Sequence, residues 1–175
     1  ASVVPSGRQL ASLMAAALPS TSARVVELGA GTGAITNALI HHGIAPESLL
    51  VVEMNPVLHR LLQKRFPHIH VACGDARHLE SLVGASHAFA ASEADAVCSS
   101  LRLLTMPKEL QRDIVAAAFN VLAPNGVFIQ YTYGPRHPLD EDVLISLGLK
   151  YRRAALAWRN LPPARVYVYS RRTPL

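Results

Sequence analysis

The chain has 175 residues, half of them apolar, which suffices for one domain with a sizeable hydrophobic core. No run approaches the roughly 18 apolar residues of a membrane-spanning helix, and no signal peptide is visible. The net charge is +5, and residues 150–175 contain seven Lys and Arg without any acid. This basic end would suit an anionic partner, either nucleic acid or a lipid surface, although it could also be a solvated face.

Cysteine and histidine usage points to no metal site. The two cysteines, Cys73 and Cys98, each lie near the end of an apolar run. We expect them to be buried thiols of a reduced, cytoplasmic protein. The eight histidines are scattered, and the pairs at 41–42 and at 68 and 70 lack a third ligand at usable spacing.

Short apolar strands alternate with helical stretches along the chain, which predicts an α/β fold with a mostly parallel sheet. The first helix should open with a capping box at Ser6-Gly7-Arg8-Gln9 and end before Pro19. Further helices are expected between strands: one up to residue 42, one capped by Asn55, one within 77–91, one starting near Pro107 and a short one through 144–147. We expect five strands and then an antiparallel pair, at 24–28, 49–53, 69–73, 95–99, 127–132, 149–158 and 165–171.

A glycine-rich loop follows the first strand, with the sequence Gly29-Ala30-Gly31-Thr32-Gly33. The missing side chains let a ligand approach the backbone where the strand turns into a helix. Glu53 closes the second strand 20 residues after Gly33 and can accept hydrogen bonds from both hydroxyls of a ribose. Met54 can pack on an adenine, and Asp75, at the end of the third strand, can receive its amino group. These positions share the strand-end edge where open α/β sheets bind ligands.

The loop also fits a loose dinucleotide-binding fingerprint, so a nicotinamide enzyme is an alternative. Three features favour S-adenosylmethionine instead. Glu27 offers a carboxylate for the ammonium of the cofactor's amino acid, and Gly33 keeps the Gly-x-Gly-x-Gly spacing. The two C-terminal strands also leave no room for a separate substrate domain.

The chain resembles the bacterial phospholipid N-methyltransferases over nearly its whole length. The segments that carry this resemblance are Val3–Ser6, Val26–Gly33, Val52–Pro56, Gly74–Ala76, Gln130–Pro135 and Trp158–Tyr167. The Tyr-Thr-Tyr-Gly-Pro and Arg-Asn-Leu-Pro-Pro-Ala stretches are the most specific of these. After the fourth strand the sequence reads Ser99-Ser100-Leu101-Arg102, where the family would have Gly-Leu-Pro.

The resemblance implies a Rossmann-like class I methyltransferase fold, with a seven-stranded, mostly parallel sheet, an antiparallel C-terminal pair and helices on both faces. Residues 1–175 would form one domain: an N-terminal lid helix (1–20), a cofactor-binding core (21–134) and a substrate side (135–175). The cofactor would be S-adenosylmethionine, and the residues expected to bind it are Ser6, Glu27, Gly29, Ala30, Gly31, Thr32, Gly33, Glu53, Met54, Asp75, Ala76 and Ser99.

The substrate implied by the resemblance is phosphatidylethanolamine, methylated up to three times to phosphatidylcholine. We expect Tyr131, Tyr133 and Ser100, or strand-end carbonyls, to orient the amine. Tyrosine rings also suit a quaternary ammonium product, which cannot hydrogen-bond. Cations and donors should hold the phosphate, with Arg136, Arg159 and Asn160 as candidates.

The partner would be a phospholipid headgroup at an anionic membrane surface, bound peripherally by a monomer from the cytoplasmic side. Family members associate with membranes partly through an amphipathic N-terminal helix, and this chain starts at Ala1 rather than Met. One rival is a ribosomal RNA adenine N6-dimethyltransferase, which needs an aromatic residue just after the fourth strand to stack a flipped base. A second rival is a non-catalytic nucleotide- or membrane-binding module.

Overall fold

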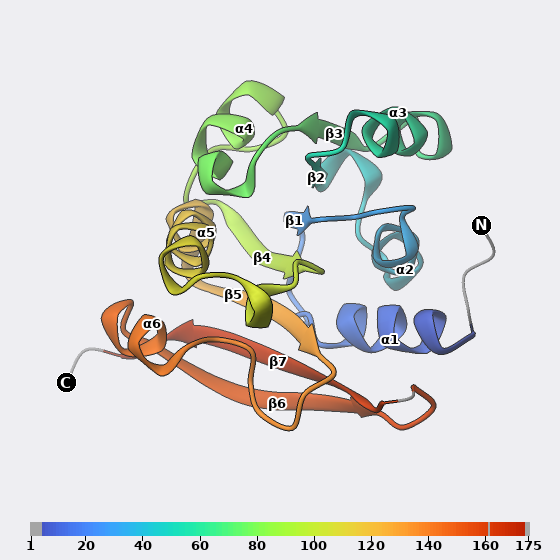
Figure 1. Cartoon of the computed structure of the whole chain (residues 1–175). Helices are drawn as coiled ribbons and strands as arrows, with labels where there is room; N and C mark the ends of the chain where they lie inside the picture. Colours follow the sequence, from blue (N-terminus) through green and yellow to red (C-terminus); the bar gives the residue numbers. More distant parts are fainter. Residues whose placement is uncertain (1–4, 161, 174–175) are drawn as a thin grey trace.

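A seven-stranded sheet forms the centre of the computed structural model, which describes residues 5–160 and 162–173 (Figure 1). The strand order is β3-β2-β1-β4-β5-β7-β6. The first five strands are parallel, whereas β7 runs antiparallel to both β5 and β6. This arrangement confirms the expected fold class. The strands are β1 (Val25–Leu28), β2 (Leu49–Glu53), β3 (His70–Cys73), β4 (Ala94–Ser99), β5 (Leu122–Thr132), β6 (Leu149–Ala157) and β7 (Ala164–Arg171).

Helices cover both faces of the sheet (Figure 1). The α-helices are α1 (Pro5–Ala16), α2 (Ala34–His42), α3 (Pro56–Arg65), α4 (Leu79–Ser86), α5 (Lys108–Val121) and α6 (Glu141–Ser146). Three 3-10 turns lie at η1 (Pro46–Ser48), η2 (Ala76–His78) and η3 (Leu103–Thr105). The core has two apolar layers, one beneath α1, α2 and α3 and the other beneath α4, α5 and α6.

Alternate side chains of each strand enter the two layers, as expected for a pleated strand buried on both faces. In β7, Val166 and Val168 pack under α1, while Tyr167 and Tyr169 enter the opposite layer. The valines and tyrosines of this strand therefore face opposite sides of the sheet. The central strand β1 is buried throughout, and its carboxyl end therefore has a fixed position next to β2 and β4.

Helix α1 differs from its prediction at its start. It begins at Pro5, so Ser6 lies inside the first turn instead of capping it. Its apolar residues Leu10 and Met14 are buried against α2 and the sheet, so the body of α1 is part of the core. The side chain of Ser6 lies outside the described residues, and its contact with the cofactor stays a prediction.

The basic C-terminal region is only partly free for a partner. Arg165 donates to the carbonyl of Gly134, Arg171 to those of Ala123 and Pro124, and Arg172 to that of Leu149. These three arginines therefore stabilise the β6–β7 hairpin through hydrogen bonds to backbone carbonyls. Lys150, Arg152 and Arg153 on the edge strand β6 and Arg159 after it are exposed.

Two further predictions need correction. Cys98 is buried as expected, but Cys73 is exposed because β3 is an edge strand. Strand β5 starts at Leu122, five residues before its predicted start, and its pairing with β4 is irregular at Ala94–Ala96. Over the described residues, no helix has both the length and the apolar character to cross a bilayer.

Candidate active site

The carboxyl ends of β1, β2 and β4 bring the predicted cofactor residues to one edge of the sheet. Leu28, the last residue of β1, pairs with Val52 on one side and with Ser99 on the other. Beyond these pairs, the N–H of Gly29 donates to the carbonyl of Val52 at 2.9 Å, and the N–H of Ser100 donates to that of Leu28 at 3.0 Å. The glycine loop and the loop after β4 therefore leave the sheet side by side.

Glu53 joins the end of β2 to the glycine loop. One of its carboxylate oxygens accepts a hydrogen bond from the N–H of Gly31 at 3.0 Å, and the other accepts from the N–H of Asn55 at 3.1 Å. Each oxygen keeps a second acceptor position. The carboxylate is therefore oriented by two backbone donors and can still accept from a ribose.

A cavity of about 440 Å³ opens in front of this edge. Five predicted residues line it: Gly29, Glu53, Met54, Asp75 and Ala76. Met54 is 68% exposed, so its side chain is free to pack on a ligand in the cavity. The rest of the lining includes four apolar side chains that no sequence motif marks, Leu101, Met106, Leu110 and Ile114.

Asp75 caps the turn η2 and forms an ion pair with Arg77 at 2.8 Å. Hydrogen bonds from the side chain and backbone of Arg77 hold the pKa of this carboxyl below its ordinary value. Asp75 thus stays ionised while facing the cavity, where an adenine amino group could donate to it.

Glu27 is fully buried beneath the glycine loop. Thr36 of α2 donates to one carboxylate oxygen at 2.6 Å, while the other oxygen has no partner among the described residues. Burial raises the pKa of Glu27 from 4.5 to about 7, an effect that the hydrogen bond from Thr36 opposes. A buried carboxylate oxygen without a donor fits a cationic ligand group.

The other loop residues have supporting positions. Ala30 is buried, the carbonyl of Thr32 accepts from Arg65, and Gly33 caps α2. Ser99 is fully buried and its hydroxyl accepts from the N–H of Leu101. The side chain of Ser99 therefore stabilises the loop after β4, and a contact of Ser99 with the cofactor stays a prediction.

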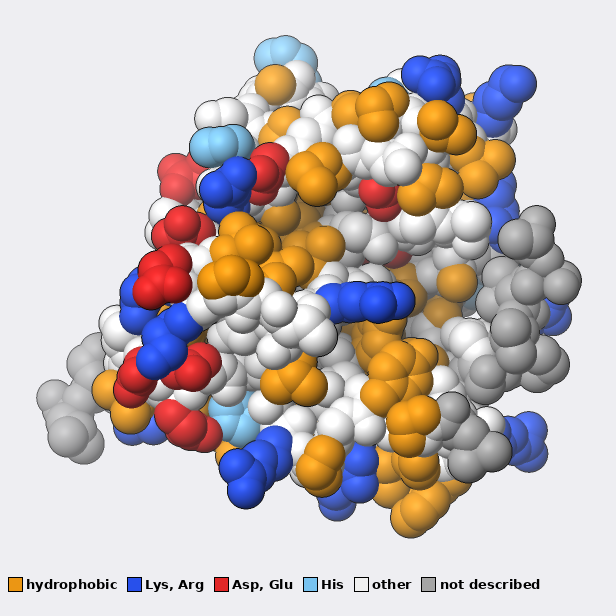
Figure 2. Space-filling view, viewed as in Figure 1, with side chains coloured by type: hydrophobic (Ala, Val, Ile, Leu, Met, Phe, Trp, Pro, Cys, Tyr) orange, Lys and Arg blue, Asp and Glu red, His pale blue; other side chains and the backbone are white. Residues whose placement is uncertain are grey.

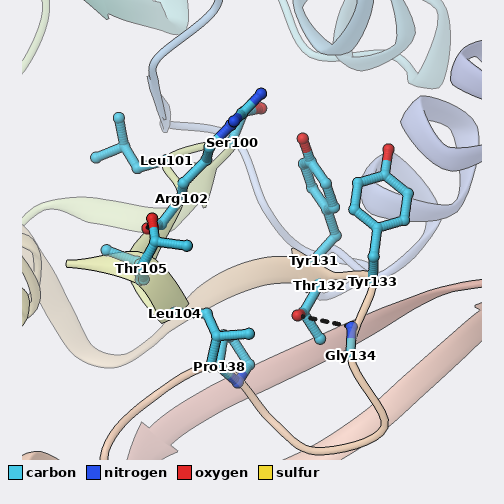
Figure 3. Close-up of a pocket in the computed structure, with 11 residues that line it drawn as sticks. Ser100, Leu101, Arg102, Leu104, Thr105, Tyr131, Thr132, Tyr133, Gly134 and Pro138 are labelled. Atoms are coloured by element: carbon cyan, nitrogen blue, oxygen red, sulfur yellow. Dashed lines mark hydrogen bonds between the residues drawn. The ribbon is translucent and has the colours of Figure 1, made fainter.

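A second cavity, of about 420 Å³, adjoins the first, because Leu101 lines both. Its walls come from the loop after β4 and from the end of β5 with the loop that follows (Figure 3). Tyr131, Tyr133 and Ser100, which were predicted to orient the amine, all line it. The cavity is also lined by Arg102, Leu104 and Thr105, for which the sequence predicts no role.

The two tyrosine rings stand edge to face, with centroids 5.6 Å apart and planes at 81°. In Figure 3 both hydroxyls point toward the same end of the cavity. Partial burial raises the pKa of Tyr131 above its ordinary value, so its phenol stays protonated near neutral pH. Tyr131 can therefore offer an aromatic face and a neutral hydroxyl, but not a phenolate base.

The three residues predicted for the headgroup phosphate do not line this cavity. Arg136 lines a neighbouring cavity of about 540 Å³ together with His137, Tyr151 and Tyr167. Arg159 is exposed after β6, and Asn160 is buried. The cavity that Arg136 lines adjoins the amine cavity across Leu104, whereas Arg159 and Asn160 line neither cavity, so the three residues do not form a single site.

The family assignment follows from comparison with known proteins. Residues 25–126, which span β1 to the first part of β5, match the family described as methyltransferase domain. The chain belongs to this family. S-adenosylmethionine is accordingly the cofactor of this methyltransferase. The open backbone at Gly31, the unpartnered oxygen of Glu27 and the oriented carboxylate of Glu53 fit its amino acid and ribose.

The methyltransferase is 35% identical to the ornithine lipid N-methyltransferase of Singulisphaera acidiphila, over 95% of this chain and 86% of the relative. Its fold resembles that of a TehB-like methyltransferase from Corynebacterium glutamicum, at a TM-score of 0.67 and 18% identity, over 95% and 88% of the two chains. It also resembles phosphoethanolamine N-methyltransferase 1 of Haemonchus contortus, solved with phosphoethanolamine and S-adenosylhomocysteine. That match has a TM-score of 0.67 and 15% identity, over 98% of this chain and 43% of the other.

Proposed function

We propose that this methyltransferase transfers methyl groups to the primary amine of a lipid headgroup. The observation that carries the proposal is the cavity lined by Tyr131 and Tyr133, which adjoins the cofactor cavity across Leu101. The relative that methylates ornithine lipid supports the same substrate class, because its similarity extends over 95% of this chain.

The amine must be neutral to react, since only the neutral form has a lone pair. With a reference pKa near 10.4 for a lysine-like amine, roughly one molecule in a thousand is neutral at pH 7. The cofactor supplies a methyl group bound to a cationic sulfur. Leu101, Leu104 and the tyrosine rings surround the amine with apolar surface, which favours its neutral form. Positioning by these side chains would provide the remaining rate enhancement, without a dedicated base.

Two lipids are candidates for the substrate. Ornithine lipid is the first to test, because the 35% identical relative is named for it. Phosphatidylethanolamine, with phosphatidylcholine as the final product, is the second, because the resemblance to phospholipid N-methyltransferases implies it. Both present a primary amine close to an anionic group, so one cavity could accept either.

The surface around the cavity suits peripheral attachment to a membrane. Leu104 is 59% exposed and lines both the amine cavity and the cavity of about 540 Å³, so lipid chains could contact an apolar side chain where the two cavities adjoin. Trp158 is 73% exposed after β6. In Figure 2 the acidic side chains gather on the left of this face, while basic and apolar side chains border the lower and right part.

An assay with radiolabelled S-adenosylmethionine tests the proposal. The protein is incubated with vesicles containing ornithine lipid, with vesicles containing phosphatidylethanolamine, or with unmodified ribosomal RNA. We expect label in one or both lipids. Label in RNA alone would overturn the proposal; the loop Ser100-Leu101-Arg102 contains no aromatic residue to stack a flipped base.

A further inference from the structure

Arg102 is the one charged side chain among the described residues that line the amine cavity. It follows Ser100 and Leu101 in the loop after β4, at the position where this sequence departs from the phospholipid N-methyltransferases. The remaining lining residues are apolar, aromatic or hydroxylic. The wall of the cavity therefore carries a positive charge and no negative one.

The guanidinium of Arg102 has no counter-ion within the part of the chain that the structure describes. The four ion pairs found there involve Arg77, Lys108 and His137. Figure 3 shows the Arg102 side chain extended past Ser100, toward the end of the cavity to which the tyrosine hydroxyls point. Its positive charge lies close enough to Tyr131 to attract the phenolate form, which lowers the pKa of that phenol and opposes the effect of burial. The exposed side chain of Arg102 thus places its donors at the border of the amine site.

We propose that Arg102 binds the anionic group of the lipid headgroup and thereby selects zwitterionic aminolipids. This inference rests on the proposed function and assigns to Arg102 the role that the sequence predicted for Arg136, Arg159 and Asn160. A guanidinium binds a carboxylate or a phosphate through two parallel hydrogen bonds, which fixes the orientation of the headgroup as well as its position. The same geometry accepts the carboxylate of ornithine lipid and the phosphate of phosphatidylethanolamine.

A cation in the wall also acts on the amine. A positive charge near a titrating amine disfavours its protonated form. Arg102 therefore binds the anion of the substrate and opposes the ammonium form, whereas a carboxylate at this position would stabilise the unreactive ammonium. We accordingly expect Arg102 to discriminate against simple amines without an anion.

The test uses the full chain with Arg102→Gln, Arg102→Lys and, as a charge-matched control, Arg60→Gln on the exposed surface of α3. For the lipid that the wild type methylates, Arg102→Gln should lower kcat/KM by about 10- to 100-fold, mainly through KM. Arg102→Lys should recover part of this loss, because lysine keeps the positive charge but cannot donate two parallel hydrogen bonds. The control should stay within about twofold of the wild type.

The source of the anion is resolved by changing the substrate. Esterifying the carboxylate of ornithine lipid with methanol removes its charge and leaves the amine intact. The wild type should lose activity on the ester, while Arg102→Gln should not distinguish the ester from the acid. If instead only phosphatidylethanolamine is a substrate and Arg102→Gln impairs its methylation, the bound anion is a phosphate.

Two results would overturn the inference while leaving the proposed function intact. One is an Arg102→Gln variant that methylates its lipid with a kcat/KM within about threefold of the wild type. The other is a parallel loss of affinity for S-adenosylhomocysteine in calorimetry, which would assign Arg102 to the cofactor carboxylate. A wild type that methylates neither lipid would instead contradict the proposed function itself.

Discussion

Glu27 and Thr36 are joined by a 2.6 Å hydrogen bond that connects β1 to α2 beneath the glycine loop. The bond occupies one carboxylate oxygen and leaves the other without a partner among the described residues. The hydrogen bond from Thr36 orients the carboxyl group of Glu27, and its second oxygen remains available as an acceptor. Burial raises the pKa of this carboxyl group to about 7. Both the affinity for the cofactor and the stability of the fold should therefore depend on pH through the ionisation of Glu27.

Cofactor affinity should fall as the pH is lowered through about 7. Above this pH Glu27 is ionised and can pair with the ammonium of the cofactor, whereas below it the carboxyl must first lose a proton. We expect the Kd of S-adenosylhomocysteine to rise about tenfold per pH unit between pH 7 and pH 5.5, with release of roughly one proton. Calorimetry in buffers of different ionisation enthalpy measures both quantities. A Kd independent of pH in this range would show that Glu27 does not pair with the ammonium.

Replacing Glu27 with Gln should stabilise the protein without cofactor while weakening cofactor binding. The pKa of Glu27 is about 7 in the folded state and 4.5 ordinarily, so the folded state binds more protons than the unfolded state between pH 4.5 and pH 7. The free energy of unfolding of the wild type therefore falls as the pH rises through this range. Above pH 7 the buried charge costs about 3 kcal/mol, which the neutral amide avoids. Denaturant unfolding at pH 8 and pH 4 tests this: the advantage of Glu27→Gln should be present at pH 8 and absent at pH 4.

The cofactor half of the site could be predicted from the sequence because it depends on strand ends. Glu53, Met54 and Asp75 each follow an apolar strand, and parallel strands bring their carboxyl ends to one edge whatever the intervening helices do. Thr36 could not be singled out in this way. It lies inside a helix, and only the packing of α2 on β1 brings its hydroxyl to Glu27.

The substrate half depends on irregular loops, for which periodicity carries no information. Arg159 follows β6 and lies away from the cavity, and Arg136 follows Pro135 into the neighbouring cavity. The sequence marked the loop after β4 as unusual, but only the three-dimensional path of that loop places Arg102 beside Tyr131. The parallel pairing of the first five strands could be predicted because a helix lies in each connection between them, whereas the strand order could not be predicted from these connections.

Gly31→Ala should weaken cofactor binding more than it weakens the fold. Gly31 has a φ of +58°, and a Cβ added there meets no protein atom within 4 Å, so the open side of its backbone is free for a ligand. Gly148 is a matched control, since its φ is +63° and its surroundings are equally open. Both variants should lose about 1 kcal/mol of unfolding free energy. Only Gly31→Ala should raise the Kd of S-adenosylhomocysteine, by about tenfold or more; equal affinities would exclude a cofactor at this loop.

The aromatic face of Tyr131 should matter more than its hydroxyl. Tyr131→Phe keeps the ring that stands edge to face with Tyr133, and the phenol is protonated in any case, so activity should fall by no more than about threefold. Tyr131→Ala removes the ring and should cost about tenfold, most in the step that forms a quaternary ammonium. Mass spectrometry of the mono-, di- and trimethylated lipids separates these steps. A Tyr131→Phe variant as impaired as Tyr131→Ala would contradict this assignment.

Trp158→Ser should reduce vesicle binding without affecting the chemistry. The indole is 73% exposed after β6, and inserting it into a lipid interface contributes about 1–2 kcal/mol, or roughly tenfold in vesicle affinity. Ile145→Ser is a suitable control, because this side chain is 67% exposed on α6, at the opposite end of the β6–β7 hairpin (Figure 1). Co-sedimentation with anionic vesicles should separate the two variants, while activity on lipid dissolved in detergent should be unchanged in both. If the two variants bind vesicles equally well, the membrane contacts a surface other than the one around Trp158.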